Sequence, residues 1–388
     1  MVNFDDTKTA FVTKSDTQLK KAYWLFKLVA SQKMVSFGKW SSALAMKIGI
    51  PIKGMVKATV YDQFVGGETI DECEQTINEL HKHRVHSILD YSVEGAKSDD
   101  DFDETMEKTI QTIKYGGARP GVPFAVFKVT GVSRFALLQK VSEGKLLSDA
   151  ENKEYIRAKK RVERICREAA DQHVSILIDA EESWIQKAID DLALEMMSTL
   201  NKDECIVYNT AQMYRWDRLN YIKELRALAE KENFYCGLKL VRGAYMEKER
   251  ERAYDMGYKS PIQPDKESTD RDYDLAIEYI LENNKRLYLM AGSHNEESTR
   301  ILTELMKKHG LPKESPNVWF SQLYGMSDNL SFILAKEGYN VVKYLPFGPI
   351  EKTLPYLIRR AEENTSAAGQ TTRELKLIEK EMKRRGID

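Results

Sequence analysis

From residue 86 onward, eight short apolar runs alternate with longer, polar segments of helical character, and this alternation limits the fold more than any other feature. The runs span 86–94, 124–130, 174–180, 205–212, 235–243, 287–292, 318–323 and 340–346. Each is rich in Val, Ile, Leu or Tyr and almost continuously apolar, which is typical of strands covered on both faces. We therefore expect an α/β protein with a (β/α)8 TIM barrel. An open doubly wound sheet is the alternative, but it normally carries a Gly-rich turn after its first strand, and the sequence has none there.

Several helix ends can be placed from capping residues. Ser148 is expected to open a helix that reaches about residue 171, and residues 182–200 have apolar side chains at helical spacing. Asn295 is expected to cap a helix that ends before Gly310, and Ser327 one that ends before Gly338.

The chain is expected to have three parts. Residues 1–85 form an N-terminal helical extension, with 17–31 as its clearest helix, residues 86–365 form the barrel, and residues 366–388 form a charged C-terminal helix. Residues 247–269, which contain Pro261 and Pro264, are interpreted as a long irregular insertion. Insertions of this length are often lids or binding loops.

Bulk composition sets limits on partners and location. The formal net charge of −1 gives no general attraction to nucleic acid. Four scattered cysteines without a CxxC pair suggest a reducing compartment and no metal site. We find no secretory signal and no run of about 18 apolar residues, so a cytoplasmic location is expected. The broken apolar stretch 41–60 leaves a peripheral membrane contact open.

Polar side chains end all eight predicted strands. In a barrel, the carboxyl ends of the strands share one mouth, where the active site lies. Eight polar ends are hard to explain by core packing alone. In chain order these residues are Glu94, Lys128, Asp179, Gln212, Arg242, His294, Gln322 and Tyr344.

Lys128 lies in an otherwise apolar strand, and a buried ammonium group needs a partner. Asp179 on the next strand is the natural counter-ion. The pair could be purely structural, or Lys128 could face a bound anion or an electron-rich ring. A Schiff-base lysine of an aldolase or lyase is a third interpretation, which a nearby carboxylate disfavours because it opposes a lowered lysine pKa.

Arg359 and Arg360 follow the eighth strand and suggest a clamp for a ligand carboxylate, because guanidinium groups match carboxylates and stay charged. Alternatively, one arginine binds ligand while the other pairs with Glu94, or both form a solvated basic pair. His294, at a strand end and helix start, could bind phosphate or belong to a capping turn. Gly243, next to Arg242, could let a backbone approach a pyrophosphate. The sequence has neither a GxGxxG turn after the first strand nor a P-loop.

Taken together, these segments resemble the proline dehydrogenases over about residues 60–365. The matching motifs are Phe64-Val-Gly-Gly-Glu-Thr69, Asp179-Ala-Glu-Glu182, Gln212-Met-Tyr214, Leu240-Val-Arg-Gly-Ala-Tyr245, Ser293-His-Asn295, Tyr324-Gly-Met326, Tyr344-Leu-Pro-Phe-Gly348 and Tyr356-Leu-Ile-Arg-Arg-Ala-Glu-Glu-Asn364. The resemblance implies a distorted barrel that holds FAD without a Rossmann domain. It also implies oxidation of L-proline to Δ1-pyrroline-5-carboxylate by hydride transfer to flavin N5, with electrons passed to a membrane quinone. Pyrroline-5-carboxylate dehydrogenase is an implied partner, and a peripheral inner-membrane location, mitochondrial in a eukaryote, is implied although no clear transit peptide is seen.

The same resemblance implies roles for individual residues. Asp179, Lys239 and Lys128 would form the catalytic group. The substrate would be bound by Lys128, Leu240, Tyr245, Tyr344, Arg359 and Arg360, with Glu94 as a gate paired with Arg359. FAD would be contacted by Ala180, Gln212, Lys239, Arg242, Gly243, Ala244, Ser293 and His294.

Two positions bear on the details of this resemblance. Lys239 stands where many bacterial members have arginine near N5, and it looks more like the eukaryotic form; a lysine supplies a point charge and no rigid fork. Tyr344 is the residue expected for proline, whereas hydroxyproline-preferring relatives tend to have a smaller polar residue. Proline is therefore the expected substrate, and hydroxyproline is the alternative.

Overall fold

The computed structural model describes residues 2–29, 54, 60–92, 96–366 and 368–387, and the side chains of residues 29 and 359–370 lie outside this description. Eight parallel strands close into a barrel in which each strand pairs with its neighbours in chain order and β8 pairs with β1. The strands are β1 Val85–Tyr91, β2 Phe124–Lys128, β3 Ser175–Asp179, β4 Val207–Gln212, β5 Cys236–Val241, β6 Leu287–Gly292, β7 Val318–Leu323 and β8 Val341–Phe347. The predicted TIM barrel is confirmed, and β6 and β7 have the predicted bounds.

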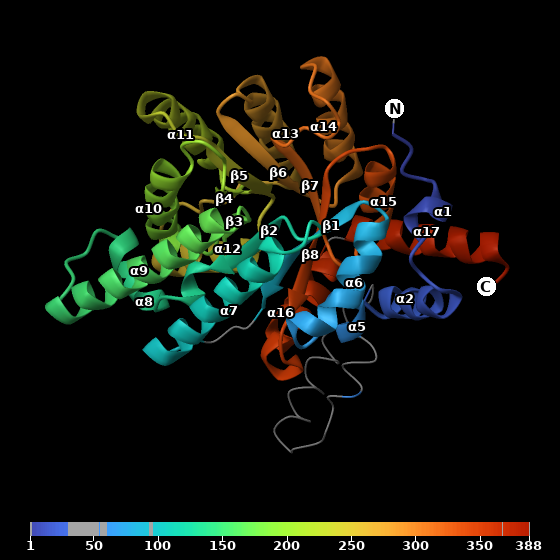
Figure 1. Ribbon diagram of the computed structural model, residues 1–388, viewed down its shortest axis with the longest axis horizontal. Helices are drawn as coiled ribbons and strands as arrows, with labels where there is room; N and C mark the ends of the chain where they lie inside the picture. Colours follow the sequence, from blue (N-terminus) through green and yellow to red (C-terminus); the bar gives the residue numbers. More distant parts are fainter. Residues whose placement is uncertain (1, 30–53, 55–59, 93–95, 367, 388) are drawn as a thin grey trace.

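Helices surround the barrel (Figure 1). Those that precede or follow the strands are α6 Ile70–Lys82, α7 Asp99–Gly117, α8 Phe135–Ser142, α9 Asp149–Asp171, α10 Ser183–Leu200, α11 Arg218–Glu232, α12 Met246–Met256, α13 Lys266–Glu282, α14 Glu296–Lys308, α15 Asp328–Lys336 and α16 Ile350–Ser366, with a 3-10 turn at Val129–Gly131. Side chains alternate along each strand, so one set fills the barrel and the other packs under the helices. Ile88, Val126, Tyr208 and Val342 belong to the inner set.

The capping predictions are largely confirmed. Ser148 opens α9 with a reciprocal capping box to Glu151, and the Asn295 side chain accepts from two backbone N–H groups at the start of α14. Ser327 precedes α15 as expected, but its side chain does not cap the helix. Its backbone lies in the left-handed region, with φ 49° and ψ 45°, and its hydroxyl points to another partner described below.

The prediction of an irregular insertion at 247–269 is wrong, because α12 covers residues 247–256 of this segment and α13 begins at Lys266. The stretch is rich in Glu, Lys and Arg, which are good helix formers, and Glu249 and Ala253 are buried on one face of the helix. Gly257 ends the helix in the left-handed conformation at φ 69°. The two prolines lie beyond this end, between α12 and α13.

The two ends of the described chain pack together outside the barrel. The helices α1 Thr7–Ala10, α2 Asp16–Val29, α5 Asp62–Phe64, α16 and α17 Ala368–Arg385 share a second apolar core. Leu19, Phe26 and Ile378 are among its buried side chains. Figure 1 shows α1, α2 and α17 on the same side of the barrel, beside α15. The expected division at residues 85 and 365 remains a prediction. Among the described helices, none combines the length and the apolarity that a membrane crossing needs.

Candidate active site at the barrel mouth

Three of the predicted site residues form a direct cluster, with Asp179 at the carboxyl end of β3, Lys239 within β5 and Tyr344 within β8. The Nζ of Lys239 lies 2.7 Å from Oδ1 of Asp179, and the Tyr344 hydroxyl donates to Oδ2 of the same carboxylate at 3.0 Å. The Lys239 ammonium also lies 4.7 Å from the centre of the Tyr344 ring. One carboxylate therefore fixes both a cation and an aromatic wall.

The Lys239–Asp179 pair was not expected from the sequence, and the expected Lys128–Asp179 pair remains a prediction beside it. Lys128 is opposite Asp179 in the register of β2 and β3, as expected. Lys239 lies on β5, and its ammonium reaches the same carboxylate at 2.7 Å. Lys128 acts electrostatically on two other acids, since its charge opposes the rise in pKa of Asp90 and of Glu181.

Asp90 is a mouth residue that the sequence reasoning missed. It is buried near the end of β1, and the Ser92 hydroxyl donates to its carboxylate. Burial raises its pKa, the Ser92 and Lys128 contacts oppose this rise, and Asp179 adds to it. An acid in an apolar strand was the available signal, and the same signal identified Lys128.

Burial also perturbs Tyr344 and Glu181. The pKa of Tyr344 is raised well above its ordinary value by burial and by the nearby Asp179 and Asp90 carboxylates, so its hydroxyl stays a donor. Burial raises the pKa of Glu181 to about 7 although Lys128 and Thr130 oppose this change. The Thr130 hydroxyl and backbone N–H donate to the Glu181 carboxylate at 2.5 and 3.1 Å.

Leu240 does not join the mouth group. It is fully buried in the core between the barrel and its helices, with its register neighbours Ala211 and Ala291. Because side chains alternate along a strand, an inward Lys239 places Leu240 on the outer face. The role of Leu240 in binding substrate remains a prediction. Tyr245 is partly exposed at the start of α12, just after β5.

The segment predicted to bind the cofactor is held by Gln212. Its side chain is buried at the end of β4, donates to the Glu181 carbonyl at 2.7 Å and accepts from the Ala244 N–H at 3.3 Å. Gly243 has φ +136°, and a Cβ there would lie 2.6 Å from the Tyr214 ring. Gly243 and Ala244 are both exposed, so their backbone is open to a ligand. Ala180 follows β3 directly and is partly exposed.

Arg242 is fixed by three contacts within the protein. It donates to Asp270 on α13 at 2.5 Å and to the hydroxyls of Ser293 and Ser298 at 2.9 Å each. Its guanidinium lies 4.4 Å from the centre of the Tyr273 ring. These contacts use three of its five N–H groups. Asp270 was missed because it lies in a polar helix, with no pattern that connects it to β5.

The Ser293–Asn295 turn has one of the two roles that the sequence left open, that of a capping turn, and phosphate binding remains a prediction. Asn295 accepts from the N–H groups of Glu297 and Ser298, so the capping turn exists and occupies two donors of α14. His294 is partly exposed, and its Nδ1 lies 2.9 Å from the Ser327 hydroxyl.

The side chains of three predicted site residues lie outside the part of the chain that the structure describes. Glu94 lies outside the described residues, beyond the end of β1. Arg359 and Arg360 lie in α16, but their side chains belong to the part outside the description. Their roles remain predictions.

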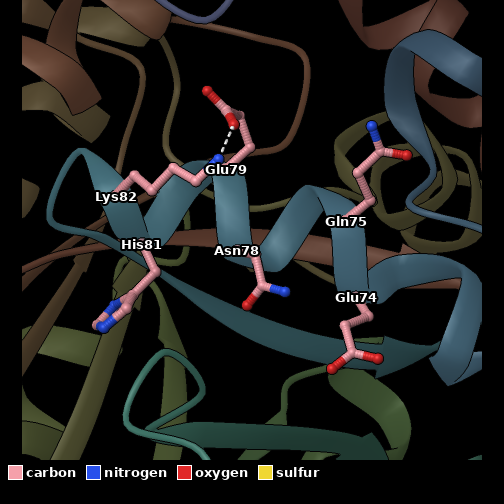
Figure 2. Close-up of a pocket in the computed structure, with 6 residues that line it drawn as sticks. All are labelled: Glu74, Gln75, Asn78, Glu79, His81 and Lys82. Carbon is pink, nitrogen blue, oxygen red and sulfur yellow. Dashed lines mark hydrogen bonds and ion pairs between the residues drawn. The ribbon is translucent and has the colours of Figure 1, made fainter.

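A pocket of about 760 Å³ lies elsewhere, along α6 (Figure 2). Its lining residues are Glu74, Gln75, Asn78, Glu79, His81 and Lys82. All six come from one helix, and none is a predicted site residue. Within the described part of the chain, no group of three or more His, Cys, Asp or Glu side chains is arranged to hold a metal ion.

Residues 73–373 match the family model for proline dehydrogenase. The chain is 35% identical over 333 residues to the carbapenem antibiotics biosynthesis protein CarD of Pectobacterium carotovorum, with 86% of each chain covered. It is 32% identical over 426 residues to the mitochondrial proline dehydrogenase 1 of Dictyostelium discoideum, covering 98% of this chain and 74% of that protein. It is also 33% identical over 365 residues to the hydroxyproline dehydrogenase of Xenopus laevis, covering 85% and 78%.

Among solved structures, proline utilization A (PutA) from Bdellovibrio bacteriovorus matches with a TM-score of 0.72 at 20% identity, which shows a shared fold. That match covers 92% of this chain, which spans only 38% of the PutA chain. The family model and the relatives above 30% identity agree with each other over most of the sequence. The chain therefore belongs to the proline dehydrogenase family, a family of flavin oxidoreductases.

Proposed function

We propose that this protein binds FAD at the barrel mouth and oxidises L-proline to Δ1-pyrroline-5-carboxylate. The observation that carries the proposal is the Lys239–Asp179–Tyr344 cluster, where three strands of a proline dehydrogenase-family barrel place a cation, an acid and an aromatic ring together. Family membership also leaves the Schiff-base aldolase or lyase role of Lys128 without support.

The residues at the mouth fit a dinucleotide such as FAD. Gly243 has a positive φ and no side chain, so its exposed backbone allows the close approach that a pyrophosphate needs. Arg242 stands beside it with two N–H groups beyond its three protein contacts. We propose that Arg242, Gly243, Ala244, Ser293 and His294 hold the ribityl, pyrophosphate and adenine parts, and that Ala180, Gln212 and Lys239 face the ring system.

The flavin, when bound, supplies the hydride acceptor, so the protein has mainly to position substrate and exclude water. Asp179 holds Lys239 and Tyr344 in fixed places at the mouth. The Tyr344 ring provides an apolar wall for a saturated ring, and Tyr245 is proposed as a second wall. Lys128 adds a positive charge suited to the proline carboxylate.

Arg359 and Arg360 are proposed as the carboxylate clamp. Tyr356 is a buried residue of α16 that acts electrostatically on Tyr344, so this part of the helix lies near the mouth. Positions three and four residues after Tyr356 share its helix face. That spacing supports a place for both arginines on the side of α16 that meets the mouth. Glu94 is proposed as the gating partner of Arg359.

Hydroxyproline is the alternative substrate, and the 33% identity to a hydroxyproline dehydrogenase supports keeping it. Tyr344 favours proline, because its ring and its Asp179-bound hydroxyl leave less room for a substituent. We further propose a membrane quinone as electron acceptor, reached by peripheral contact, and pyrroline-5-carboxylate dehydrogenase as the enzyme that takes the product. The relatives named mitochondrial support a mitochondrial location in a eukaryote.

Kinetics of Arg359→Ala and Arg360→Ala test the clamp. The loss of a charged carboxylate contact is expected to raise KM for L-proline by about 10²-fold, while the flavin stays bound. Arg167→Ala is a matched control, because Arg167 is exposed on α9 and pairs only within its own helix with Glu163 in the described structure. Unchanged proline kinetics in both variants would remove the clamp from the proposal.

A further inference from the structure

We infer that Glu374 on α17 is a positioning residue for His294, and that it acts through Ser327. The C-terminal helix, which lies outside the barrel, would then help to position a side chain of the barrel mouth. The inference rests on the proposed function to the extent that His294 contacts FAD.

Two hydrogen bonds make the connection. The Ser327 N–H donates to Oε2 of Glu374 at 3.1 Å, and the Ser327 hydroxyl lies 2.9 Å from Nδ1 of His294. Ser327 is fully buried and Glu374 is buried, whereas His294 is partly exposed at the end of β6. A continuous path of contacts therefore runs from the interior of α17 to a side chain that follows the end of β6.

The backbone of Ser327 supports a specific role. Its φ of 49° and ψ of 45° lie in the left-handed region, which is unfavourable for a residue with a Cβ. Such a conformation persists where the surroundings determine it several times over, and it is concentrated at functional sites. Here Glu374 accepts from the N–H, while the Ser327 carbonyl accepts from the N–H groups of Leu330 and Ser331.

The rest of the β7–α15 loop is anchored as well. Gly325 has φ +80°, and a Cβ there would lie 1.9 Å from the Gln63 carbonyl oxygen. The Gln63 side chain donates to the Gly325 carbonyl at 2.7 Å, and the buried Lys343 donates to the Met326 carbonyl at 2.5 Å. With its neighbours fixed, Ser327 has little freedom, and the Glu374 contact sets the direction of its hydroxyl.

The charges around Glu374 come from three elements. Asp328 starts α15 and pairs with Lys343 of β8 at 2.9 Å and with Lys14, before α2, at 3.6 Å. All three act electrostatically on Glu374. An acceptor oxygen at residue 374, rather than its charge alone, is what the Ser327 N–H requires, so glutamine and leucine should behave differently there.

Nitrogen NMR of the histidine side chains tests the connection without relying on activity. The protein has six histidines, and the His294 signal is identified by its loss in His294→Gln. We expect Glu374→Leu to shift the His294 imidazole nitrogens in the FAD-free protein, and Glu374→Gln to restore them. Glu381→Leu is the matched control, because Glu381 is also a buried acid of α17 but binds Arg384 and Arg385.

Ser327→Gly is a second variant that is expected to fold, because glycine readily adopts the positive φ at this position. It removes the hydroxyl that contacts His294. It should move the His294 signals as Glu374→Leu does. Both variants should weaken FAD binding about tenfold, the size expected for one lost hydrogen bond, and Glu381→Leu should not.

Unmoved His294 signals in folded Glu374→Leu and Ser327→Gly would overturn the inference, as would equal shifts in Glu381→Leu. The His294→Gln variant distinguishes a failure of this inference from a failure of the proposed function. If that variant keeps full FAD affinity while Glu374→Leu still moves the His294 signals, the connection stands and the cofactor role of His294 is wrong.

Discussion

Lys239 and Asp179, which lie 60 positions apart in the chain, meet at 2.7 Å across the mouth of the barrel. Their side chains are only 9% and 14% exposed. A buried ion pair of this kind is costly to break by removing one partner, because the remaining charge stays desolvated.

Asp179→Asn should therefore destabilise the protein by about 3 kcal/mol, since it leaves the Lys239 ammonium buried without a counter-charge. Urea unfolding of the purified variant measures this loss. Asp191→Asn is the control, because Asp191 pairs with Lys187 at 2.6 Å on an exposed helix surface. Its cost should stay below about 0.5 kcal/mol. Equal costs for both variants would contradict a buried, structurally important pair.

Tyr344→Ser should shift the substrate preference. It removes the aromatic wall and the hydroxyl that is bound to Asp179, which makes room for a substituent on the ring of the substrate. The ratio of kcat/KM for trans-4-hydroxyproline to that for L-proline should rise about tenfold. Tyr344→Phe keeps the bulk and should change this ratio much less. A larger shift in the phenylalanine variant would assign selectivity to the hydroxyl alone.

Gly243→Ala should both destabilise the protein and reduce its FAD content. A Cβ at φ +136° meets the Tyr214 ring at 2.6 Å, so conformational strain and overlap act together, at a cost above about 2 kcal/mol. Gly257→Ala is a matched control, since φ is +69° there and nothing lies within 4 Å of the new Cβ. It should cost only about 1 kcal/mol and leave FAD content unchanged. Thermal unfolding and the flavin released on denaturation give the two readouts.

Stability should depend on pH through Glu374, whose pKa burial raises from 4.5 to about 7. Burial favours the neutral form of this carboxyl in the folded protein. Below the pKa of the unfolded chain the group is neutral in both states, so it does not lower the free energy of unfolding there. As pH rises towards the pKa of the folded protein, the free energy of unfolding falls, and above that pKa the loss stays constant at about 3 kcal/mol.

Glu374→Gln cannot ionise and should lose less stability between about pH 5 and about pH 8 than the unchanged protein. Glu181, whose pKa is also raised to about 7, contributes in the same direction to both proteins. The difference between the two urea-unfolding series therefore isolates Glu374. Parallel pH profiles would show that this carboxyl does not titrate in that range.

The sequence predicted the barrel well because each strand repeats a simple pattern. Strands buried on both faces are continuously apolar, and β6 and β7 needed no correction. The prediction of an irregular insertion was wrong for a local reason. Two prolines suggested a loop, while the charged residues of α12 were good helix formers whose one buried face was set by tertiary packing.

The site could be predicted only one strand at a time. Strand ends identify Lys128, Asp179 and Tyr344, and the family resemblance adds Lys239, but neither says that Lys239 reaches Asp179 across the interior. The direction of the Leu240 side chain could not be predicted, because a motif gives no inward or outward direction until one neighbour is fixed. The link from Glu374 to His294 joins segments about 80 residues apart with no shared periodicity, so it becomes visible only in three dimensions.

The most direct test of the account is the visible spectrum of the purified protein, recorded without oxygen before and after addition of L-proline. The account predicts a yellow protein whose oxidised-flavin absorbance bleaches with L-proline, and more slowly with trans-4-hydroxyproline. A flavin that stays oxidised with both compounds, or a folded protein that neither carries nor takes up FAD, would contradict it.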